Sequence, residues 1–263
     1  MNAPGQGVVV TGAGHGIGRA LAARLAAEGA RVLVNDLDAE AAGRVAEEIG
    51  GYAVPGDAAS EEGVAALVDA ARAHLGGIDA WFANAGIDRG HGLDAQEADW
   101  AASLEVNVLA HVRAARLLVP EWAERGSGRF VVTASAAGLL TMLGSPTYSV
   151  SKHAAVAFAE WLSATYRHRG VVVQAICPQG VKTRMLADAG GALEDVLSHD
   201  TALEPEDVAE AMWQALQDDR FLVLPHPEVG EYYAVRATQT DRWLHGMNKL
   251  QRRVDEHEQG ARA

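Results

Sequence analysis

Near its N-terminus the chain reads Val8-Val9-Val10-Thr11-Gly12-Ala13-Gly14-His15-Gly16-Ile17-Gly18, a β-branched run followed at once by closely spaced glycines. The run predicts a strand at residues 8–11, and the helical spacing of Ile17, Leu21 and Leu25 predicts a helix directly after the glycines. Glycines in this position allow a sharp turn and a close approach to a pyrophosphate, which the free N–H groups of the helix N-terminus can bind. The stretch therefore predicts a dinucleotide-binding turn.

An acidic residue follows this turn at the distance that dinucleotide binding requires. Asp36 ends the next predicted strand, residues 31–36, eighteen positions after Gly18. Its carboxylate can accept hydrogen bonds from the adenosine ribose hydroxyls. It would also repel the extra phosphate of NADP, and no lysine or arginine stands at positions 15, 35 or 37 to offset that charge. NAD is the predicted cofactor, although Asp36 could instead cap the helix that starts near Asp38.

Strand and helix patterns alternate along the rest of the chain as far as Leu224. Further strands are predicted at 52–54, 78–83, 129–133, 171–177 and 221–224, and helices at 39–49, 61–75, 97–124, 149–169 and 205–216. Strands such as Val171-Val172-Val173 lack polar alternation, which is typical of strands covered by helices on both faces. We expect a single α/β domain, residues 1–263 with its core at 7–224. Its architecture should be a Rossmann-type doubly wound parallel β-sheet of about seven strands, flanked by helices on both faces.

Two regions depart from the alternation. Residues 182–203 are long, rich in small residues and contain Gly190-Gly191, so we expect a mobile lid. The C-terminal extension, residues 225–263, places Trp243, Leu244, Met247 and Leu250 at the spacing of an amphipathic helix. This helix could pack on the body or a neighbouring subunit, or it could cap the substrate entrance. We expect the last residues, 255–263, to be frayed.

Composition limits the classes of function. The 263 residues are 49% hydrophobic, which excludes a disordered or collagen-like chain, and the formal net charge of −13 disfavours nucleic acid as a partner. No apolar run approaches the ~20 residues of a membrane span, and we expect no secretory signal. The single cysteine, Cys177, excludes an internal disulfide and a cysteine-cluster metal site, so no metal is expected. We interpret Cys177 as a small buried hydrophobe and expect a cytoplasmic protein.

A second group of residues predicts proton chemistry. Tyr148 and Lys152 are four residues apart and so share one face of a helix. An ammonium beside a phenol favours the phenolate and lowers the phenol pKa, which allows proton exchange with an alcohol or carbonyl near neutral pH. Ser135 follows the fifth predicted strand, as the glycine turn follows the first. The carboxyl ends of parallel strands form one ligand-binding edge, where these groups can converge.

With these motifs in this order, the chain resembles the short-chain dehydrogenase/reductase family in its compact, NAD-dependent form, from about Gly7 to Leu224. The residues that carry the resemblance are the glycine turn Thr11-Gly12 to Gly16-Ile17-Gly18, Asp57, the motif Asn84-Ala85-Gly86, Asn107, Ser135, and Tyr148 with Lys152.

The resemblance implies hydride transfer between a nicotinamide and a carbon that bears a hydroxyl or carbonyl group. In that scheme Tyr148 exchanges the proton, Lys152 lowers its pKa and binds the nicotinamide ribose, and Ser135 holds the substrate oxygen. Asn107 maintains a proton relay from Lys152 to solvent. The expected catalytic set is therefore Asn107, Ser135, Tyr148 and Lys152.

The same resemblance, together with the glycine turn and Asp36, assigns the cofactor site. Asp57 would hold the adenine ring, Asn84 would support the sheet beside the cofactor, and Thr183 would bind the nicotinamide carboxamide. The expected cofactor-binding residues are Gly12, Gly14, His15, Gly16, Ile17, Gly18, Asp36, Leu37, Asp57, Ala58, Asn84, Ala85, Gly86, Tyr148, Lys152, Pro178, Gly180, Val181 and Thr183.

The sequence departs from the family after the sixth strand, where Pro-Gly is usual and Gln179 stands instead. Our hypothesis is that Gln179 narrows the pocket or bonds the substrate; its side chain could also simply turn outward. Arg89 could bind a carboxylate or remain solvated on its loop. Candidate substrate residues are Ile87, Ala137, Met142, Gln179, Met185 and Leu186, from loops that also include residues 139–143. Because most are apolar, we expect a small-molecule substrate that is a hydrophobic secondary alcohol or ketone.

The family commonly assembles through its long helices, so we expect a homo-oligomer, a tetramer or a dimer. Two other functions stay open. One is a non-catalytic NAD(H)-sensing binding protein, which would have no need of the catalytic set. The other is a nicotinamide-dependent epimerase or dehydratase, which generally needs a larger C-terminal domain than the residues after 224 provide.

Overall fold

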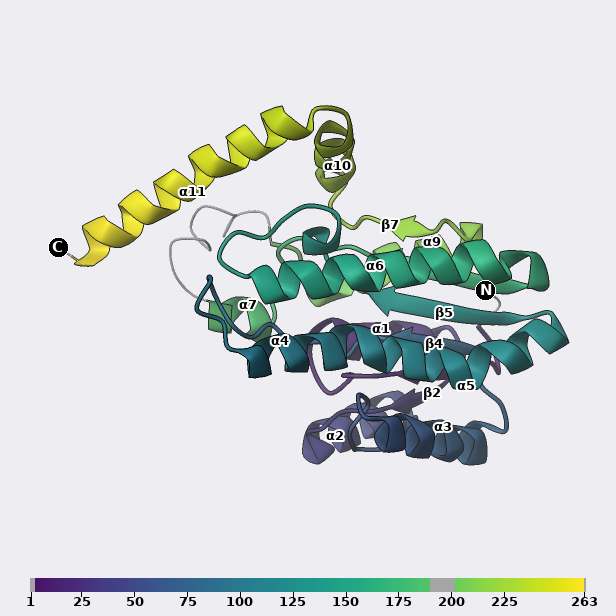
Figure 1. Cartoon of the computed structure of the whole chain (residues 1–263). Helices are drawn as coiled ribbons and strands as arrows, with labels where there is room; N and C mark the ends of the chain where they lie inside the picture. Colours follow the sequence, from purple (N-terminus) through teal and green to yellow (C-terminus); the bar gives the residue numbers. More distant parts are fainter. Residues whose placement is uncertain (1–2, 190–201, 263) are drawn as a thin grey trace.

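The computed structural model describes residues 3–189 and 202–262 of the chain (Figure 1). Seven strands form one sheet in the order β3-β2-β1-β4-β5-β6-β7, and every neighbouring pair is parallel. The strands are β1 (Gly7–Val10), β2 (Arg31–Val34), β3 (Tyr52–Ala53), β4 (Ala80–Ala83), β5 (Gly128–Thr133), β6 (Val171–Ile176) and β7 (Leu222–Val223). The predicted doubly wound parallel sheet is confirmed.

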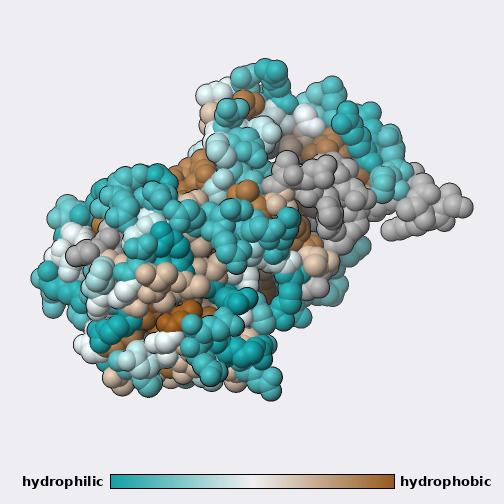
Figure 2. All heavy atoms as spheres, turned by 180° about the vertical axis from the view of Figure 1, so that it is seen from behind, coloured by the Kyte–Doolittle hydropathy of each residue, from teal (hydrophilic) through white to brown (hydrophobic). Residues whose placement is uncertain are grey.

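Helices cover both faces of this sheet. One layer contains α3 (Glu61–Leu75), α4 (Glu97–Leu104), α5 (Ala110–Arg125) and α6 (Pro146–Tyr166), and the other contains α1 (Gly16–Ala27), α2 (Ala39–Ile49) and α9 (Pro205–Asp218). Two separate apolar clusters fill the spaces between these layers and the sheet. This explains why the residues of β1 and β4 are buried throughout. The back of the molecule, the side of α1 and α9, is largely hydrophilic (Figure 2).

The order of the strands fixes the place of a ligand. β1 pairs with β2 on one side and with β4 on the other, so the direction of winding reverses between β1 and β4. In open α/β sheets, ligands bind outside the carboxyl ends of the strands at such a switch point. The loops after β1, β4, β5 and β6 all leave the sheet at this edge, because all the strands are parallel.

Two predicted helices differ from the structure at the site itself. The predicted helix 97–124 is interrupted by a π-helical turn, Glu105–Leu109, which contains Asn107. The predicted helix 149–169 begins earlier, at Pro146, and ends in a 3-10 turn, Arg167–Arg169. Proline suits the first position of a helix because that position has no hydrogen-bonding partner for an N–H. Tyr148 therefore lies in the first turn of α6.

The predicted lid and C-terminal extension are described only in part. The lid begins with α7 (Arg184–Ala189), and its residues 190–201 lie outside the described part of the chain. The extension forms α10 (Glu228–Thr238) and α11 (Thr240–Arg262), so the tail expected to be frayed is helical as far as Arg262.

The extension contacts the body through α10. Val229 is fully buried, and Arg236 donates a hydrogen bond of 2.8 Å to the carbonyl of Leu139 in the loop after β5. α11 projects away from the body on the side where the strands end (Figure 1). Both expected roles of this helix, packing against a subunit and capping the entrance, stay predictions.

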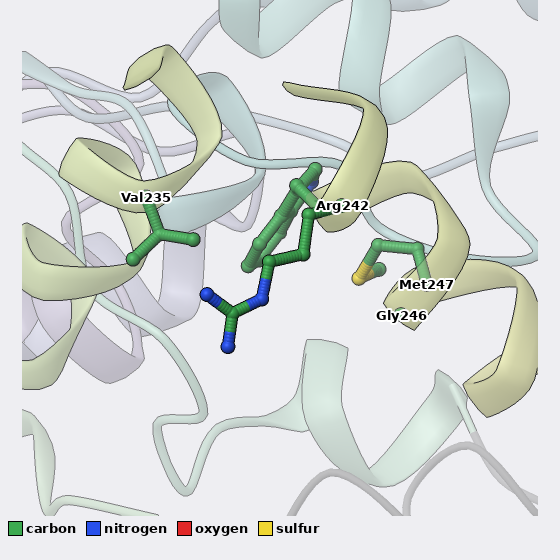
Figure 3. A pocket seen from close by; sticks show the side chains of 5 residues that line it. Val235, Arg242, Gly246 and Met247 are labelled. Atoms are coloured by element: carbon green, nitrogen blue, oxygen red, sulfur yellow. The ribbon is translucent and has the colours of Figure 1, made fainter. Parts of the chain in front are cut away.

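A hollow of about 210 Å³ lies between α10 and α11, lined by Val235, Arg242, Trp243, Gly246 and Met247 (Figure 3). None of the expected catalytic residues lines it. Within the described ranges, no helix is long and apolar enough to cross a membrane, and no group of histidine, cysteine and acidic residues is arranged to hold a metal ion.

Candidate active site

The glycine turn after β1 is built as the sequence predicts. Gly12 and Gly16 adopt positive φ angles of +60° and +50°, which side-chain-bearing residues rarely adopt. A Cβ atom on Gly18 would lie 2.2 Å from the carbonyl oxygen of Gly12, so any side chain there would force the turn open. His15 precedes α1 without capping it, and the first turn of α1 contains no acidic residue. The N-terminal N–H groups of α1 therefore face a space that suits an anion.

The Asn84-Ala85-Gly86 motif holds this turn in place. The side-chain amide of Asn84 donates to the carbonyl oxygens of Thr11 (2.9 Å) and Gly12 (3.1 Å). In return, the Thr11 hydroxyl oxygen accepts the N–H groups of Asn84 and Ala85, both at 3.0 Å. The loops after β1 and β4 are thus bonded together across the switch point.

Asp36 lies beside the glycine turn. One carboxylate oxygen accepts the N–H of Gly14 at 2.9 Å, and the other accepts the N–H of Asp38 at 3.0 Å. The cap of α2 is Asp38, which accepts the N–H of Ala41, so the alternative role of Asp36 as that cap is wrong. The Ala41 bond, followed by the contact with His15, holds the pKa of Asp38 below its ordinary value. Leu37 is 79% exposed.

Asp57 shapes the start of α3. Its carboxylate accepts the N–H groups of Ala59 (2.8 Å) and Ser60 (3.2 Å), and hydrogen bonding, first with the Ser60 side chain, lowers its pKa. Ala58 follows it on the same partly exposed segment. The expected contact of Asp57 with an adenine ring stays a prediction.

The loop after β6 lies across from the glycine turn. The carbonyl of Pro178 accepts the N–H of Ala136 at 2.8 Å, which joins this loop to the segment that carries Ser135. A Cβ atom on Gly16 would lie 3.0 Å from the methyl group of Thr183, so the two loops meet there. Gly180 and Val181 pair with Leu203 at the far end of the lid. The structure therefore brings the expected cofactor residues of three loops to one edge of the sheet.

The catalytic candidates converge at this same edge. Ser135 lies close enough to the phenol of Tyr148 to lower its pKa, and the Nζ of Lys152 lies 5.5 Å from the centre of the Tyr148 ring. Lys152 is buried and donates to the carbonyl of Thr133 at 2.9 Å. A Cβ on Gly86 would be 3.1 Å from both Lys152 Nζ and Asn107 Oδ1, so glycine is needed here to leave room for these groups.

Asn107 ties three elements together. It is fully buried in the π-helical turn, where its side-chain oxygen accepts the N–H of Ile87 and its amide donates to the carbonyl of Ile87, both at 2.9 Å. The amide also donates to the Ser151 hydroxyl on α6, at 2.9 Å. Asn107 therefore fixes the loop after β4 against the helix that carries Tyr148 and Lys152.

Burial shifts the pKa values of both Tyr148 and Lys152. The sequence suggests that Lys152 lowers the pKa of Tyr148, but in the structure burial raises the pKa of Tyr148 to about 12, against the lowering effect of the Ser135 side chain. Burial also lowers the pKa of Lys152 to about 8, because a buried ammonium loses its hydration. Burial is therefore the largest influence on the pKa of Tyr148 in the structure, and the expected lowering of that pKa by Lys152 stays a prediction.

The candidate substrate residues differ in their placement. Ile87 and Ala137 lie at the catalytic edge, since Ile87 bonds to Asn107 and the N–H of Ala137 donates to the Ser135 hydroxyl at 3.0 Å, although Ala137 is buried. Met142 bonds through its N–H to Ser149 (3.0 Å) on α6. Met185, 39% exposed, and Leu186 lie on α7 at the start of the expected lid, and their contact with a substrate stays a prediction.

Gln179 is turned inward. Its side-chain oxygen is buried and has no hydrogen-bond partner in the described part of the chain, so the outward orientation considered above is wrong. Its N–H donates to Nδ1 of His226 at 3.1 Å, and His226 is itself buried, with no partner for Nε2 among the described residues. Sequence reasoning missed His226, because it follows β7, forty-seven positions away.

Sequence reasoning also missed two groups beside Lys152. Burial, reinforced by the charge of Lys152, lowers the pKa of His111 to about 3, so this histidine is neutral. Asp88, on the loop after β4, raises the pKa values of both Tyr148 and Lys152 through its charge. The position of His111 four residues after Asn107 on one helix was an available signal, whereas no sequence pattern places Asp88 near Tyr148.

A doubly wound parallel sheet with a glycine turn at its switch point defines the class of Rossmann-type proteins. A family model described as short chain dehydrogenase matches residues 6–193. The chain belongs to the short-chain dehydrogenase family and is an oxidoreductase.

Relatives and solved structures agree with this assignment. The chain is 37% identical over 243 residues to 1-deoxy-11-beta-hydroxypentalenate dehydrogenase of Streptomyces exfoliatus, covering 87% of this chain and 86% of that protein. It is 32% identical over 244 residues to cyclohexanol dehydrogenase of an Acinetobacter species, covering 89% and 94%. A crystal structure of a short chain dehydrogenase/reductase from Burkholderia phymatum in complex with NAD aligns with a TM-score of 0.83 and 29% identity, covering 92% of this chain and 96% of that one.

Proposed function

We propose that this chain is an NAD(H)-dependent dehydrogenase that interconverts a secondary alcohol and a ketone, with Tyr148 as the general acid and base. The observation that carries the proposal is the convergence of Ser135, Tyr148 and Lys152 beside the glycine turn, at the carboxyl edge of the sheet. A binding protein that only sensed NAD(H) would not need this group.

The residues present fit a dinucleotide. The positive φ angles of Gly12 and Gly16 and the close backbone contact at Gly18 form a tight turn, which would let a pyrophosphate approach the N-terminus of α1. A bound NAD⁺ would supply the hydride acceptor. Asp36 would hold the adenosine ribose, Thr183 the carboxamide end, and Lys152 the nicotinamide ribose.

Each side chain of this site would have a separate role in the proton transfer. Ser135 would donate a hydrogen bond to the substrate oxygen and hold it next to the Tyr148 phenol. In the oxidative direction Tyr148 accepts the proton of the alcohol, and in the reductive direction it returns that proton to the ketone oxygen. Because burial raises the pKa of Tyr148 to about 12, the phenolate needs the positive charge of Lys152 to form near neutral pH. Asn107 holds the loop after β4 against α6, so that Tyr148 and Lys152 keep their positions for this transfer.

Asp36 supports a preference for NAD over NADP. Its carboxylate lies at Gly14, where the extra phosphate of NADP would approach, and like charges in a partly buried site repel. We expect kcat/KM with NAD to exceed that with NADP by about 100-fold, and Asp36→Ser to reduce this ratio by at least about 10-fold, as steady-state kinetics with both cofactors will measure. A wild-type preference for NADP would contradict the assignment. Asp69→Asn, which removes one negative charge from an exposed side chain on α3 outside the expected cofactor site, is the control.

We propose a cyclic, largely apolar secondary alcohol as the substrate. Two relatives that align over most of this chain are named for cyclic alcohols, hydroxypentalenate and cyclohexanol. The apolar residues around the catalytic edge, among them Ile87 and Met142, agree with such a substrate. The inward side chain of Gln179 would narrow the pocket beside it.

We also propose that the chain forms a homo-oligomer through α4, α5 and α6. These helices lie side by side on one face of the molecule (Figure 1). These helices and the π-helical turn between α4 and α5 expose large apolar side chains, namely Leu104, Leu109, Leu117, Val150 and Trp161. Exposed apolar side chains gathered on one face can mark an interaction site. The choice between tetramer and dimer stays a prediction, as does the cytoplasmic location.

A further inference from the structure

Asp88 is a carboxylate at the catalytic edge for which the proposed proton transfer has no use. It follows Ile87 on the loop after β4 and is half-buried. Its charge acts on both Tyr148 and Lys152. A negative group therefore lies near the catalytic pair.

The backbone on both sides of Asp88 is clamped. On one side, Asn107 bonds to the N–H and the carbonyl of Ile87, both at 2.9 Å. On the other side, the Thr147 hydroxyl, next to Tyr148 on α6, donates to the carbonyls of Arg89 and Gly90. Asp88 is therefore held at a fixed position relative to Tyr148.

The two oxygens of the Asp88 carboxylate have different surroundings. Oδ1 accepts a hydrogen bond from the Ser145 hydroxyl, just before α6. Oδ2 has no hydrogen-bond partner within residues 3–189 and 202–262, and Asp88 as a whole residue is only half-buried. An ionised carboxylate accepts hydrogen bonds and donates none. Oδ2 is thus a free acceptor beside the reacting group.

The neighbouring cation does not neutralise this site. Arg89 is directed to Asp99, with 3.7 Å between its Nε and the Asp99 Oδ1, and its side chain is 61% exposed. The expectation that Arg89 could bind a substrate carboxylate therefore has no support in the geometry. The loop presents a negative charge, not a positive one, to the substrate.

We propose that Asp88 determines substrate specificity: its free oxygen accepts a hydrogen bond from a second hydroxyl group adjacent to the reacting carbon, and its charge disfavours a carboxylate at that place. The preferred substrates are then cyclic diols or their hydroxyketones. This inference rests on the proposed dehydrogenase function and specifies its substrate class.

The test compares three alcohols on wild-type protein and Asp88→Asn: cyclohexanol, a vicinal cyclohexanediol and the matching hydroxycyclohexanecarboxylate, each with NAD at one pH. The asparagine oxygen can still accept the Ser145 hydroxyl, while the free acceptor becomes a donor. We expect the ratio of kcat/KM for the diol to that for cyclohexanol to fall by about 10- to 100-fold, the range for one charge-assisted hydrogen bond. The hydroxy acid should improve relative to cyclohexanol.

Ratios are used because the loss of the Asp88 charge also changes the pKa of Tyr148, which affects all three substrates alike. Asp94→Asn is the matched control: Asp94 is exposed on the same loop, so this variant should leave both ratios unchanged. Asp88→Ser serves the same comparison if Asp88→Asn does not fold. If Asp88→Asn leaves the ratio of kcat/KM for the diol to that for cyclohexanol unchanged, this inference is overturned. A wild-type preference for the hydroxy acid would overturn it too. Neither result would contradict the proposed dehydrogenase function. Failure of wild-type protein to oxidise any of the three would overturn the proposed function as well.

Discussion

Tyr148→Phe is expected to reduce kcat for alcohol oxidation by about 10³-fold, the scale of a general acid–base contribution. The substitution removes only the phenol oxygen, which lies near Ser135 and is the group we propose to accept the substrate proton. Phenylalanine keeps the ring that lies 5.5 Å from Lys152, so the surrounding packing stays intact. Steady-state and single-turnover formation of NADH will measure the loss.

The control for this variant is cofactor affinity. Because the proposed NAD contacts are made mainly by the glycine turn, Asp36 and Thr183, Tyr148→Phe should bind NADH with a Kd within a few-fold of wild type, as protein fluorescence can report. Thr165→Val, on the outer part of α6, should leave both rate and affinity unchanged, since its hydroxyl only bonds to the carbonyl of Trp161. Full turnover by Tyr148→Phe would rule out the proposed base.

Lys152→Met is expected to lower the oxidation rate at neutral pH by about 10²-fold, because a neighbouring charge shifts a pKa by about 1–3 units. Without the ammonium, the pKa of Tyr148 stays high and less phenolate forms. The rate should recover at alkaline pH, so that the whole pH profile moves upward by about 1–3 units. A rate loss with an unshifted profile would show that Lys152 acts by binding alone.

Lys152→Met should not destabilise the fold at neutral pH, although it should lower the oxidation rate. Burial lowers the pKa of Lys152 from 10.5 to about 8, so between these two values the unfolded chain binds more protons than the folded one. Stability from this group therefore rises as the pH increases from about 8 to about 10.5, and below that window the buried charge is a cost. Methionine removes the cost, so the Tm of Lys152→Met at neutral pH should equal or exceed that of wild type. A lower Tm would mean that the bond to Thr133 matters more than the charge.

The sequence was sufficient for most of the fold because its patterns are local. The β-branched runs at 8–11 and 171–177 mark buried strands, and the glycines at 12, 16 and 18 stand where the chain has positive φ angles or close contacts. The π-helical turn at Asn107 was not predictable, since it has the same apolar spacing as the helices on either side. The early start of α6 at Pro146 was signalled by proline itself.

The electrostatics of the site could be predicted only in part. Helical spacing places Lys152 near Tyr148, but spacing says nothing of burial, which raises the pKa of Tyr148. Asp88 and His226 reach the site from loops after β4 and β7, and their contacts with Ser145 and Gln179 depend on tertiary packing. Residues that act through the packing of distant loops have no periodic signature in a sequence.

The most direct test of Tyr148 as the proton acceptor is the pH dependence of single-turnover NADH formation with a secondary alcohol. We predict that the rate rises about tenfold per pH unit below the pKa of Tyr148 in the complex and levels off above it, and that Tyr148→Phe loses this dependence. A wild-type rate that stays constant from about pH 6 to about pH 10 would contradict the proposed mechanism.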